Sequence, residues 1–501
     1  MSIRIFLILV FSTHFTFAQK VITPRSSAMP QTSATLQASA TPEASAKLQA
    51  SATLQIPAPA IFVIKNVNVI TMASQSKIIE HASVVVNGNI IQSINGPVPK
   101  NATVIDGTGK WMIPGFIDSH VHLPTDTYLR ERAPTQAPDL SFNTQDLMTP
   151  FVANGVTTIL DLNSTMQTFA QKKEIEKGYA LGPRIALAAL INGGDGKGRV
   201  ANTAQEGRLL VKQAKQEGYD FIKVYSGLNI ETYDAIIDEA YKQGMKTLGH
   251  IPDAFAGKIE QAFIPHFGLV AHAEEFSKKS DSFSVSDAQR FAKLAADNGT
   301  WLSPTLTAMV WIARQTSSVD SIKYAPALKY VHPLLQSKWL TANNYAKNAS
   351  PESIIYFNKM VKYHFQLVKS FRDAGVPIIA GTDAGVSGVI AGFSLHDELE
   401  LLVQAGLTTQ EALNSATLLS AQWLGIDQKV GSIEIGKFAD LILLDENPLT
   451  DIKNIRKISG VFVNGNWLDK KKLSRMLSDL ARLNTANKDK FDWKKVMSNQ
   501  N

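Results

Sequence analysis

The 501-residue chain contains no cysteine. A disulfide framework and a lipoprotein-type anchor cysteine are therefore both excluded. An exported bacterial protein can do without cysteine, because disulfides are optional in the periplasm and in secreted proteins.

Long hydrophobic runs are also missing after the N-terminus. No later stretch reaches the ~18 apolar residues that a membrane helix needs, so no membrane span is predicted. Arg4 precedes the run IFLILVFSTHFTFA, which is too short to cross a bilayer with any margin. Thr16 and Ala18 fit the small-residue positions of a cleavage site before Gln19. Residues 1–18 are predicted to be a secretory signal peptide, and the protein is expected to be periplasmic or secreted.

Charge of one sign is not in large excess. The net charge is +6, which is mild for this length, and the basic residues are scattered along the chain. The densest basic run, Lys470–Lys472, fits a solvated helix face. The sequence therefore shows no electrostatic footprint for nucleic acid.

Composition divides the rest of the chain into segments. Residues 19–60 are rich in Ala, Ser, Thr, Gln and Pro and cannot bury a core, which predicts a disordered linker. Short β-branched runs separated by turn residues occur in 61–112 and again in 427–468. Neither group has enough strands for its own core, so the two are predicted to share one small β-sandwich. The tail, 469–501, has apolar residues at helical spacing and predicts an amphipathic helix docked on the body.

Residues 113–426 alternate short apolar strands with helical patterns, as in an α/β protein with a parallel sheet. Eight strands over this length fit a (β/α)8 TIM barrel with insertions. A doubly wound sheet is the alternative, but the only glycine-rich candidate for its phosphate loop, INGGDGKG at 191–198, matches neither known pattern. The aromatic-rich stretch 308–371 is longer than a barrel needs and predicts a lid over a substrate pocket. The predicted strands are 115–122, 155–162, 184–190, 220–226, 246–252, 269–275, 301–307 and 377–384.

Polar residues stand at the carboxyl ends of these strands, where barrel active sites lie. The segment GFIDSHVHLP places His120 and His122 one residue apart at the end of the first strand. Residues i and i+2 of an extended chain face the same way, so both imidazoles can converge on one cation. An isolated pair of this kind also occurs in protein cores and on surfaces. Its meaning depends on the polar residues at the other strand ends, which are Lys223, His250, His272 and Asp383.

These residues lie in motifs that resemble the amidohydrolase superfamily of metal-dependent hydrolases, in its binuclear prolidase and imidazolonepropionase-like branch. The resemblance covers Ile61 to about Leu468. IPGFIDSHVHL resembles the first-strand signature, and FIKVYSG, GH, AHAEE, AGTDAG, LVQAGLTTQEALNSAT and GSIEIGKFADLILLDENPL follow in the order found in the family. The motif around His272 departs from the family's frequent I-E-H-G, which leaves the roles of Glu274 and Glu275 open.

The resemblance implies two divalent metal ions, with zinc as the usual metal and manganese or cobalt as tolerated replacements. A lysine ammonium has no acceptor atom and cannot bind a cation directly. The resemblance implies that Lys223 is a carboxylated lysine. A structural lysine that snorkels or pairs with Asp383 is the alternative. The implied ligands are His120, His122 and Asp383 for one ion and His250 and His272 for the other, with carboxylated Lys223 between them.

Three further roles are expected. The resemblance implies that Asp383 takes a proton from the attacking water and passes it to the leaving nitrogen. Strand alternation puts Tyr225 on the same face as Lys223, so Tyr225 is expected to contact substrate, with a packed tyrosine as the alternative. His396 begins the helix after the eighth strand and is expected to line the substrate pocket, with a role in a local hydrogen-bond network as the alternative.

The sequence therefore predicts an exported metal-dependent amidohydrolase that cleaves a C–N bond of a small-molecule or dipeptide-like substrate with a metal-bridging hydroxide. A dipeptidase is the first candidate, because export suits the scavenging of external peptides. A mononuclear deaminase and a cyclic-amide hydrolase are the alternatives within the family. A non-catalytic binding protein on the same scaffold would lack ligands, and none is missing here. A homo-oligomer stays open.

Overall fold

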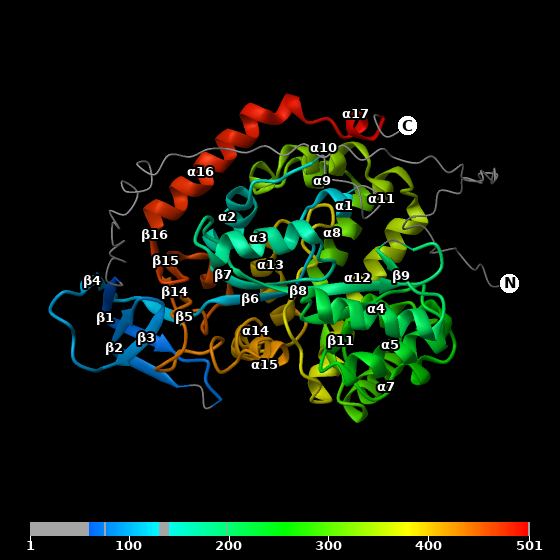
Figure 1. Ribbon diagram of the computed structural model, residues 1–501, viewed down its shortest axis with the longest axis horizontal. Coiled ribbons are helices and arrows are strands. Elements are labelled where there is room, and N and C mark those ends of the chain that lie inside the picture. The colour runs from blue at the N-terminus through cyan, green and yellow to red at the C-terminus, as the bar shows by residue number, and fades with distance from the viewer. Residues whose placement is uncertain (1–59, 75–76, 130–139, 197, 499–501) are drawn as a thin grey trace, which may run out of the picture. The chain divides into compact units, whose positions relative to one another are not determined.

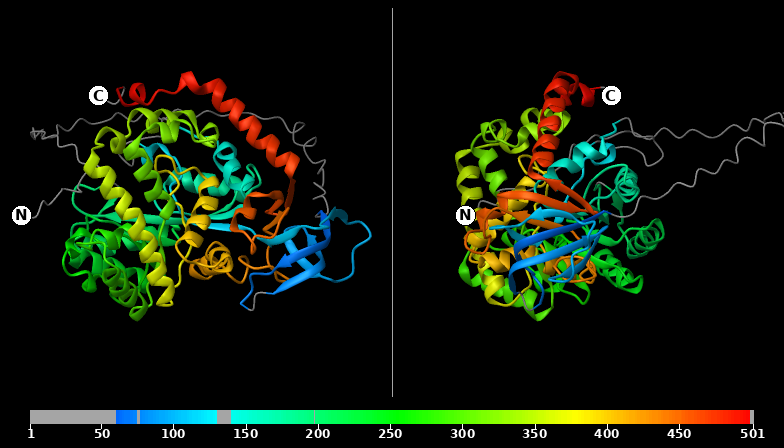
Figure 2. Two further views of the ribbon diagram at one scale, coloured as in Figure 1. Left: turned by 180° about the vertical axis from the view of Figure 1, so that it is seen from behind. Right: turned by 90° about the vertical axis from the view of Figure 1, so that its left-hand side faces the viewer.

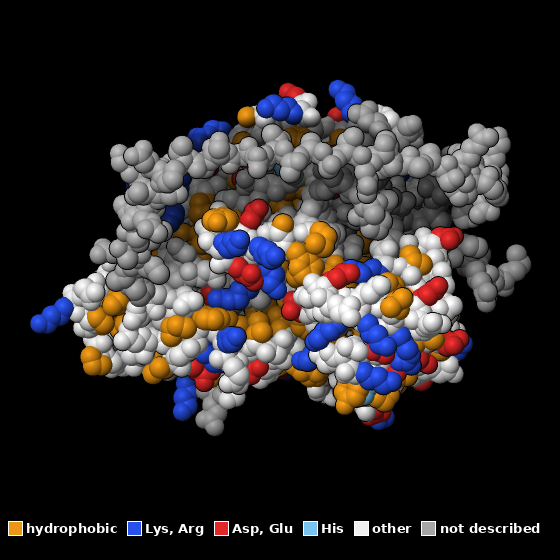
Figure 3. Space-filling view, viewed as in Figure 1, with side chains coloured by type: hydrophobic (Ala, Val, Ile, Leu, Met, Phe, Trp, Pro, Cys, Tyr) orange, Lys and Arg blue, Asp and Glu red, His pale blue; other side chains and the backbone are white. Residues whose placement is uncertain are grey.

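The computed structural model describes residues 60–498 except 75–76, 130–139 and 197 (Figure 1). The predicted signal peptide and almost all of the predicted linker lie outside the described residues. Within the described part, no helix is both long and apolar enough to cross a bilayer. On the face drawn in Figure 3, Lys and Arg side chains are interspersed with acidic ones and form no continuous basic tract.

Strands from both ends of the described chain form one eight-stranded sheet. The sheet order is β16-β15-β14-β5-β1-β2-β3, and β4 pairs with β1. The two chain ends meet where β5 pairs antiparallel with β14, and Figure 2 shows the N-terminal and C-terminal strands side by side. The strands are β1 (Ile61–Ile70), β2 (Ile78–Asn87), β3 (Ile90–Ile94), β4 (Thr103–Asp106), β5 (Trp111–Pro114), β14 (Leu441–Leu444), β15 (Ile458–Val463) and β16 (Asn466–Asp469).

This sheet curls around a core of its own. The rings of Phe62 in β1 and Phe462 in β15 lie 5.4 Å apart, although β14 and β5 separate their strands in the sheet order. Neighbouring strands are spaced about 4.8 Å, so a flat sheet would hold these strands about 14 Å apart. The predicted sharing of one β-unit by the two ends of the chain is confirmed, as a single curled sheet.

A second sheet, entirely parallel in its main path, forms the barrel. Its order follows the sequence from β6 to β13, with the short β9 (Arg199–Val200) added to the edge of β8. These strands are β6 (Phe116–Val121), β7 (Val156–Asp161), β8 (Arg184–Asn192), β10 (Phe221–Val224), β11 (Lys246–Gly249), β12 (Phe267–Ala271) and β13 (Trp301–Ser303).

The eighth predicted strand, 377–384, closes the barrel with isolated bridges in place of a regular ladder. On one side, Ile379 N donates to Leu302 O of β13 at 2.9 Å. On the other side, Ser119 N of β6 donates to Ala380 O at 3.0 Å. The segment thus bonds to both neighbours, which confirms the predicted (β/α)8 TIM barrel.

Most of the predicted barrel strands are shorter in the structure than expected, and two of them end four residues early. The strand expected over 269–275 ends at Ala271, and the strand expected over 301–307 ends at Ser303. His272 (φ 78°) and Thr305 (φ 49°) adopt left-handed backbone conformations, which turn the chain out of the strand direction.

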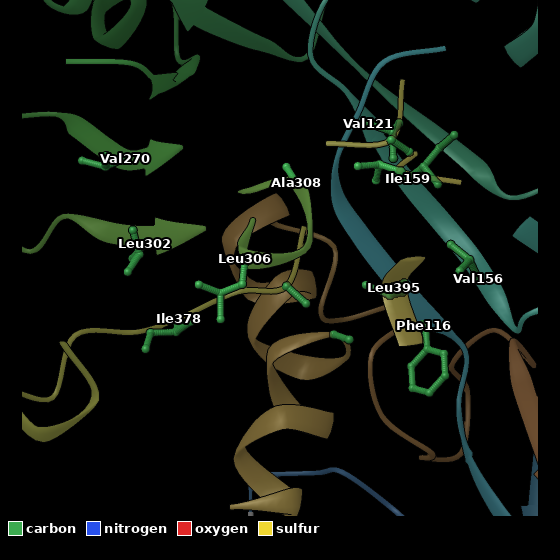
Figure 4. Packing of buried hydrophobic residues seen from close by; sticks show 14 of the residues in the cluster. Phe116, Val121, Val156, Ile159, Val270, Leu302, Leu306, Ala308, Ile378 and Leu395 are labelled. Atoms are coloured by element: carbon green, nitrogen blue, oxygen red, sulfur yellow. The ribbon is translucent and has the colours of Figure 1, made fainter. Parts of the chain in front are cut away.

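The amino ends of the barrel strands are closed by apolar packing. The ring of Trp423, in α15, stacks on Phe221 at the start of β10 with centroids 5.2 Å apart. Leu160, Leu248 and Ile379 belong to the same buried cluster. Figure 4 shows a second cluster, in which residues such as Val156, Val270 and Leu302 pack between strands and helices. Polar side chains are thereby left to the carboxyl ends.

The helices around the barrel begin at regular caps, such as the Thr203–Glu206 and Thr408–Glu411 capping boxes. They are α1 (Asp126–Leu129), α2 (Thr144–Ala153), α3 (Met166–Glu176), α4 (Ala204–Glu217), α5 (Ile230–Lys242), α6 (Glu274–Ser277), α7 (Val285–Asp297), α8 (Leu306–Ser317), α13 (Phe393–Gln404), α14 (Thr409–Ser415) and α15 (Leu418–Leu424).

The predicted insertion and the C-terminal tail are both helical. The insertion continues from α8 through α9 (Asp320–Lys323), the 3-10 helix η3 (Leu328–Tyr330), α10 (Pro333–Thr341), α11 (Asn344–Lys347) and α12 (Pro351–Asp373). The tail forms α16 (Lys470–Asn487) and α17 (Trp493–Ser498). Helix α16 packs on α2, η3 and α10 through one apolar face that includes Leu473 and Leu480 (Figure 1).

Ile442 tests the junction between the curled sheet and the barrel. It is fully buried in β14 and reaches Gly155, just before β7. Ile442→Ala should lower the free energy of unfolding by about 2–5 kcal/mol, because a large buried side chain leaves a cavity. Ile435→Ala, at a position that is 64% exposed, should change it by less than about 0.5 kcal/mol. Denaturant unfolding of both variants measures the difference, and equal effects would contradict this packing.

Candidate functional site

Four histidine rings gather at the carboxyl ends of the barrel strands. His120 and His122 come from the end of β6, while His250 follows β11 and His272 follows β12. The centroid of the His120 ring lies 5.3 Å from that of His122 and 4.5 Å from that of His272, and the His272 ring lies 4.9 Å from that of His250. Residues more than 100 positions apart therefore form one continuous group.

Asp383 brings a carboxylate to this group from the eighth strand position. Its Oδ1 lies 3.2 Å from His120 Nε2 and 3.1 Å from His122 Nε2. One ligand atom from each of the three residues lies within 4.8 Å of the other two. Two imidazole nitrogens and one carboxylate oxygen at this spacing fit a transition-metal cation such as zinc.

The protonation states suit the same purpose. Burial, followed by the Lys223 ammonium, lowers the pKa of His120 to about 3. Burial likewise lowers the pKa values of His250 and His272 well below the usual range. Burial alone would raise the pKa of Asp383, but His120 and the hydrogen bonds from both nearby histidines lower it well below its usual value. Near neutral pH, His120, His250 and His272 are therefore neutral imidazoles and Asp383 is a carboxylate, the forms that bind cations.

Lys223 lies inside this group. Its side chain is only 1% exposed, and its Nζ has no hydrogen-bond partner among the described residues. Burial lowers the pKa of the amino group to about 8, although Asp383 and Glu275 oppose the shift. A buried amino group without a partner is costly unless something else interacts with it. The Lys223 amino group therefore has unused hydrogen-bonding capacity that a further group could satisfy.

Side chains behind the histidines fix how the rings point. Ser226 Oγ lies 2.9 Å from His250 Nδ1, and Glu275 Oε1 lies 3.2 Å from the same nitrogen. Thr305 Oγ1 lies 2.7 Å from His272 Nδ1. Both rings therefore use Nδ1 toward the protein, which leaves Nε2 for a ligand.

Buried carboxylates also hold the loops that carry the site. Asp118 accepts hydrogen bonds from Thr382 N at 3.0 Å and from Thr382 Oγ1 at 2.7 Å, directly before Asp383. Glu398 accepts from the first two backbone N–H groups of α8, at 3.0 and 2.7 Å. Asp383 itself has φ 62°, a strained conformation for a non-glycine residue that these contacts maintain.

Tyr225 reaches the group and His396 does not. The Tyr225 ring lies 4.2 Å from that of His250, and burial, followed by Asp383, raises the pKa of Tyr225 to about 12. His396 is buried elsewhere, with Nε2 2.9 Å from Asn154 O, near the amino end of β7. The prediction that His396 lines the pocket therefore needs correction: its ring faces the end of the barrel away from the histidine group.

Several residues that support the site were not singled out from the sequence. Glu275 was left undecided, and the hydroxyls of Ser226 and Thr305 had no assigned role. Asp118 stands two residues before His120, so its position in D-S-H was the available signal. Tyr345 was expected only as part of a lid. Burial, followed by Glu274 and Asp383, raises its pKa.

The chain matches known proteins over most of its length. The model of the "Amidohydrolase family" matches residues 111–468. The 5'-deoxyadenosine deaminase of Methanobrevibacter smithii is 26% identical over 375 residues, which cover 69% of this chain and 74% of that protein. The imidazolonepropionase of Christiangramia forsetii is 22% identical over 375 residues, which cover 73% of this chain and 85% of that protein.

Solved structures share the fold. A Xaa-Pro dipeptidase with bound methionine aligns with a TM-score of 0.62 and 23% identity, covering 82% of this chain and 100% of that one. The bottromycin amidohydrolase aligns with a TM-score of 0.68 and 22% identity, covering 87% of this chain and 92% of that one. At these identities the likeness establishes the architecture of the chain.

Two neighbouring glutamates give a matched test of the histidine group. Glu275 is 1% exposed and holds His250, whereas the Glu274 side chain is 27% exposed. Glu275→Gln should weaken the binding of a divalent cation about 10–100-fold, because it loosens a ring that orients a ligand nitrogen. Glu274→Gln should change it by no more than about twofold. Calorimetric titration with Zn²⁺ measures both, and equal affinities would show that Glu275 does not orient His250.

Proposed function

The chain belongs to the amidohydrolase family, and on that premise we propose that it is a metal-dependent hydrolase that cleaves an amide or peptide-like C–N bond. The curated relatives are named as a deaminase and an imidazolonepropionase, which both act on C–N bonds. The family model covers the whole barrel and most strands of the C-terminal half of the curled sheet.

The observation that carries this proposal is the buried amino group of Lys223. It lies close enough to His120, His250 and Asp383 to affect their pKa values or to be affected by them. Carboxylation would join the lysine nitrogen to CO₂ and release two protons from the ammonium form, replacing a buried cation without a partner by an anion. The carbamate oxygens would then face the ligand nitrogens of the surrounding histidines.

The donor set fits two cations. His120, His122 and Asp383 would hold one cation, His250 and His272 would hold the other, and carboxylated Lys223 would supply oxygen ligands between them. Bound cations would polarise the scissile carbonyl and make water more acidic.

The protein groups then have separate tasks. Asp383 accepts a proton from the attacking water as the new C–O bond forms, and then delivers it to the leaving nitrogen as the C–N bond breaks. Tyr225 borders the site beside His250 and contacts substrate. Ser226, Thr305 and Glu275 keep the histidine rings in place.

A dipeptide-like substrate is the first candidate, and its support is the N-terminal sequence. The run of apolar residues after Arg4 and the small residues before Gln19 suit an exported enzyme. An enzyme in the periplasm or outside the cell meets peptides as nitrogen sources. Dipeptide hydrolysis therefore accounts for both the site and the leader.

Deamination is the second candidate. Its support is the deaminase among the curated relatives, together with the three-residue group His120, His122 and Asp383, which can hold a single ion without Lys223. In that case Lys223 would have a structural role. The two candidates differ in the number of ions and in the tolerance of Lys223 to substitution.

The metal content separates them directly. Protein purified without chelator should carry about two equivalents of transition metal by elemental analysis, and removal of the metal should abolish hydrolysis of a dipeptide library. His120→Ala should lose both metal and activity, because it removes a ligand. A stable content of one equivalent would favour the deaminase.

Substitution of Lys223 gives the sharper test. Lys223→Ala should abolish hydrolysis and lower the metal content, because the group between the two ions is lost. Formate or propionate should restore part of both by placing a carboxylate in the vacated space. Lys223→Arg should remain inactive, because a guanidinium stays charged and has no acceptor. A Lys223→Arg variant with normal activity and metal content would overturn the binuclear site.

A further inference from the structure

An apolar pocket opens beside the histidine group. His122, Ala384 and Gly385 form its inner wall, so it adjoins both His122 and the backbone that follows Asp383. Its cavity volume is about 70 Å³, and the hollow around it opens to solvent. We call it the α16 pocket, because helix α16 closes one side through Leu480 and Asn484.

Carbon atoms make up most of the surface of this pocket. The apolar wall comes from four elements that are distant in sequence: the α2 region, α10, the segment after Asp383, and α16. Six of its residues are Phe142, Leu147, Leu335, Trp339, Ile390 and Leu480. A surface of this kind favours apolar groups, which leave water on entering it.

The polar groups in the wall are mostly engaged by the protein itself. His332 Nδ1 accepts a hydrogen bond from Leu334 N at 3.2 Å, and its ring packs between Phe142 and Phe491. Burial lowers the pKa of His332 to about 4, so this ring is uncharged near neutral pH. Asn484 Nδ2 donates to Lys329 O at 3.0 Å. These contacts leave Asp146 as the acidic side chain of the wall.

Helix α16 lies outside the part of the chain that matches the family model, which ends at residue 468. The helix is nevertheless well anchored. Asp469 caps its first turn by accepting from Lys472 N at 2.7 Å, and Leu473 is buried two turns before Leu480. Leu473 does not line the pocket, so the two leucines separate the anchoring of the helix from its contact with the pocket.

We propose that the α16 pocket receives an uncharged hydrophobic side chain of the substrate beside the scissile C–N bond, and that Leu480 sets its size. That the bound molecule is a substrate rests on the proposed hydrolase function. The kind of side chain that binds is inferred from the pocket alone. The preferred substrates are then amides of residues such as phenylalanine or leucine. Alanine fills too little of the pocket, and lysine would bring an ammonium group into an apolar wall.

Binding of short amides to the purified full-length protein tests the proposal without requiring turnover. The probes are the N-acetyl amides of phenylalanine, alanine and lysine, titrated by calorimetry in the presence of a metal chelator. The phenylalanine probe should bind about tenfold more tightly than the alanine probe, or better, because it buries a phenyl ring. The lysine probe should bind no better than the alanine probe.

Matched variants of α16 assign the effect to the pocket. Leu480→Phe should fill the pocket and reduce the ratio of phenylalanine to alanine affinity about tenfold, whereas Leu473→Phe should leave that ratio unchanged. Thermal unfolding shows whether both phenylalanine variants fold. If either does not, Leu480→Ala and Leu473→Ala serve as the test. Leu480→Ala should improve binding of an N-acetyl naphthylalanine amide severalfold, and Leu473→Ala should not.

The outcomes separate this proposal from the proposed function. Equal affinities for the three probes, no binding at millimolar concentration, or tightest binding of the lysine probe would each overturn the pocket assignment. The last result would identify Asp146 as a recognition group for a cation. Selective binding without hydrolysis of the matching amides or dipeptides by metal-loaded protein would support the pocket and contradict the hydrolase.

Discussion

Hydrogen bonds from Thr382 to the buried carboxylate of Asp118 join the first strand of the barrel to its last, and the geometry of the site depends on them. The eighth position has no regular strand ladder, so side-chain contacts help to fix the chain there. Asp383 N and Thr382 N both approach His120 O, at 2.8 and 3.3 Å, which places the Asp383 carboxylate against the histidine pair. The strained backbone of Asp383 persists because Asp118 and β6 hold it from both sides.

The inward face of β10 shows how the barrel divides its interior into an apolar half and a reactive half. Phe221 is the first residue of this strand and stacks on Trp423, which closes the amino end. Lys223 faces the same way two residues later and lies where the apolar packing ends. Tyr225 follows at the mouth beside His250. The inward side chains of this one strand thus change from apolar packing at the amino end to a buried amine, and then to an aromatic residue at the edge of the histidine group.

The sequence was sufficient to predict which polar residues gather at the strand ends, because strand periodicity and the carboxyl-end rule do not require knowledge of side-chain packing. It could not predict that β12 stops at Ala271 and β13 at Ser303, since His272 and Thr305 take left-handed conformations that normally favour glycine. The role of Glu275 depends on a contact with a residue 25 positions earlier, and no local pattern announces it. His396 was placed wrongly because its position in sequence, just after the eighth strand, does not say which end of the barrel its ring faces.

The α16 pocket could not be predicted from the sequence, for a related physical reason. Its walls come from α2, the long insertion and α16, and only helix packing brings these elements together. The groups that would perform the chemistry are fixed to strand ends by backbone hydrogen bonds, so their geometry follows from closing a barrel. The pocket walls are held by apolar side-chain contacts, whose sizes can change at a cost of a few kcal/mol or less. A fold built in this way can keep one arrangement of metal ligands while the helices laid over it set which side chain fits beside them.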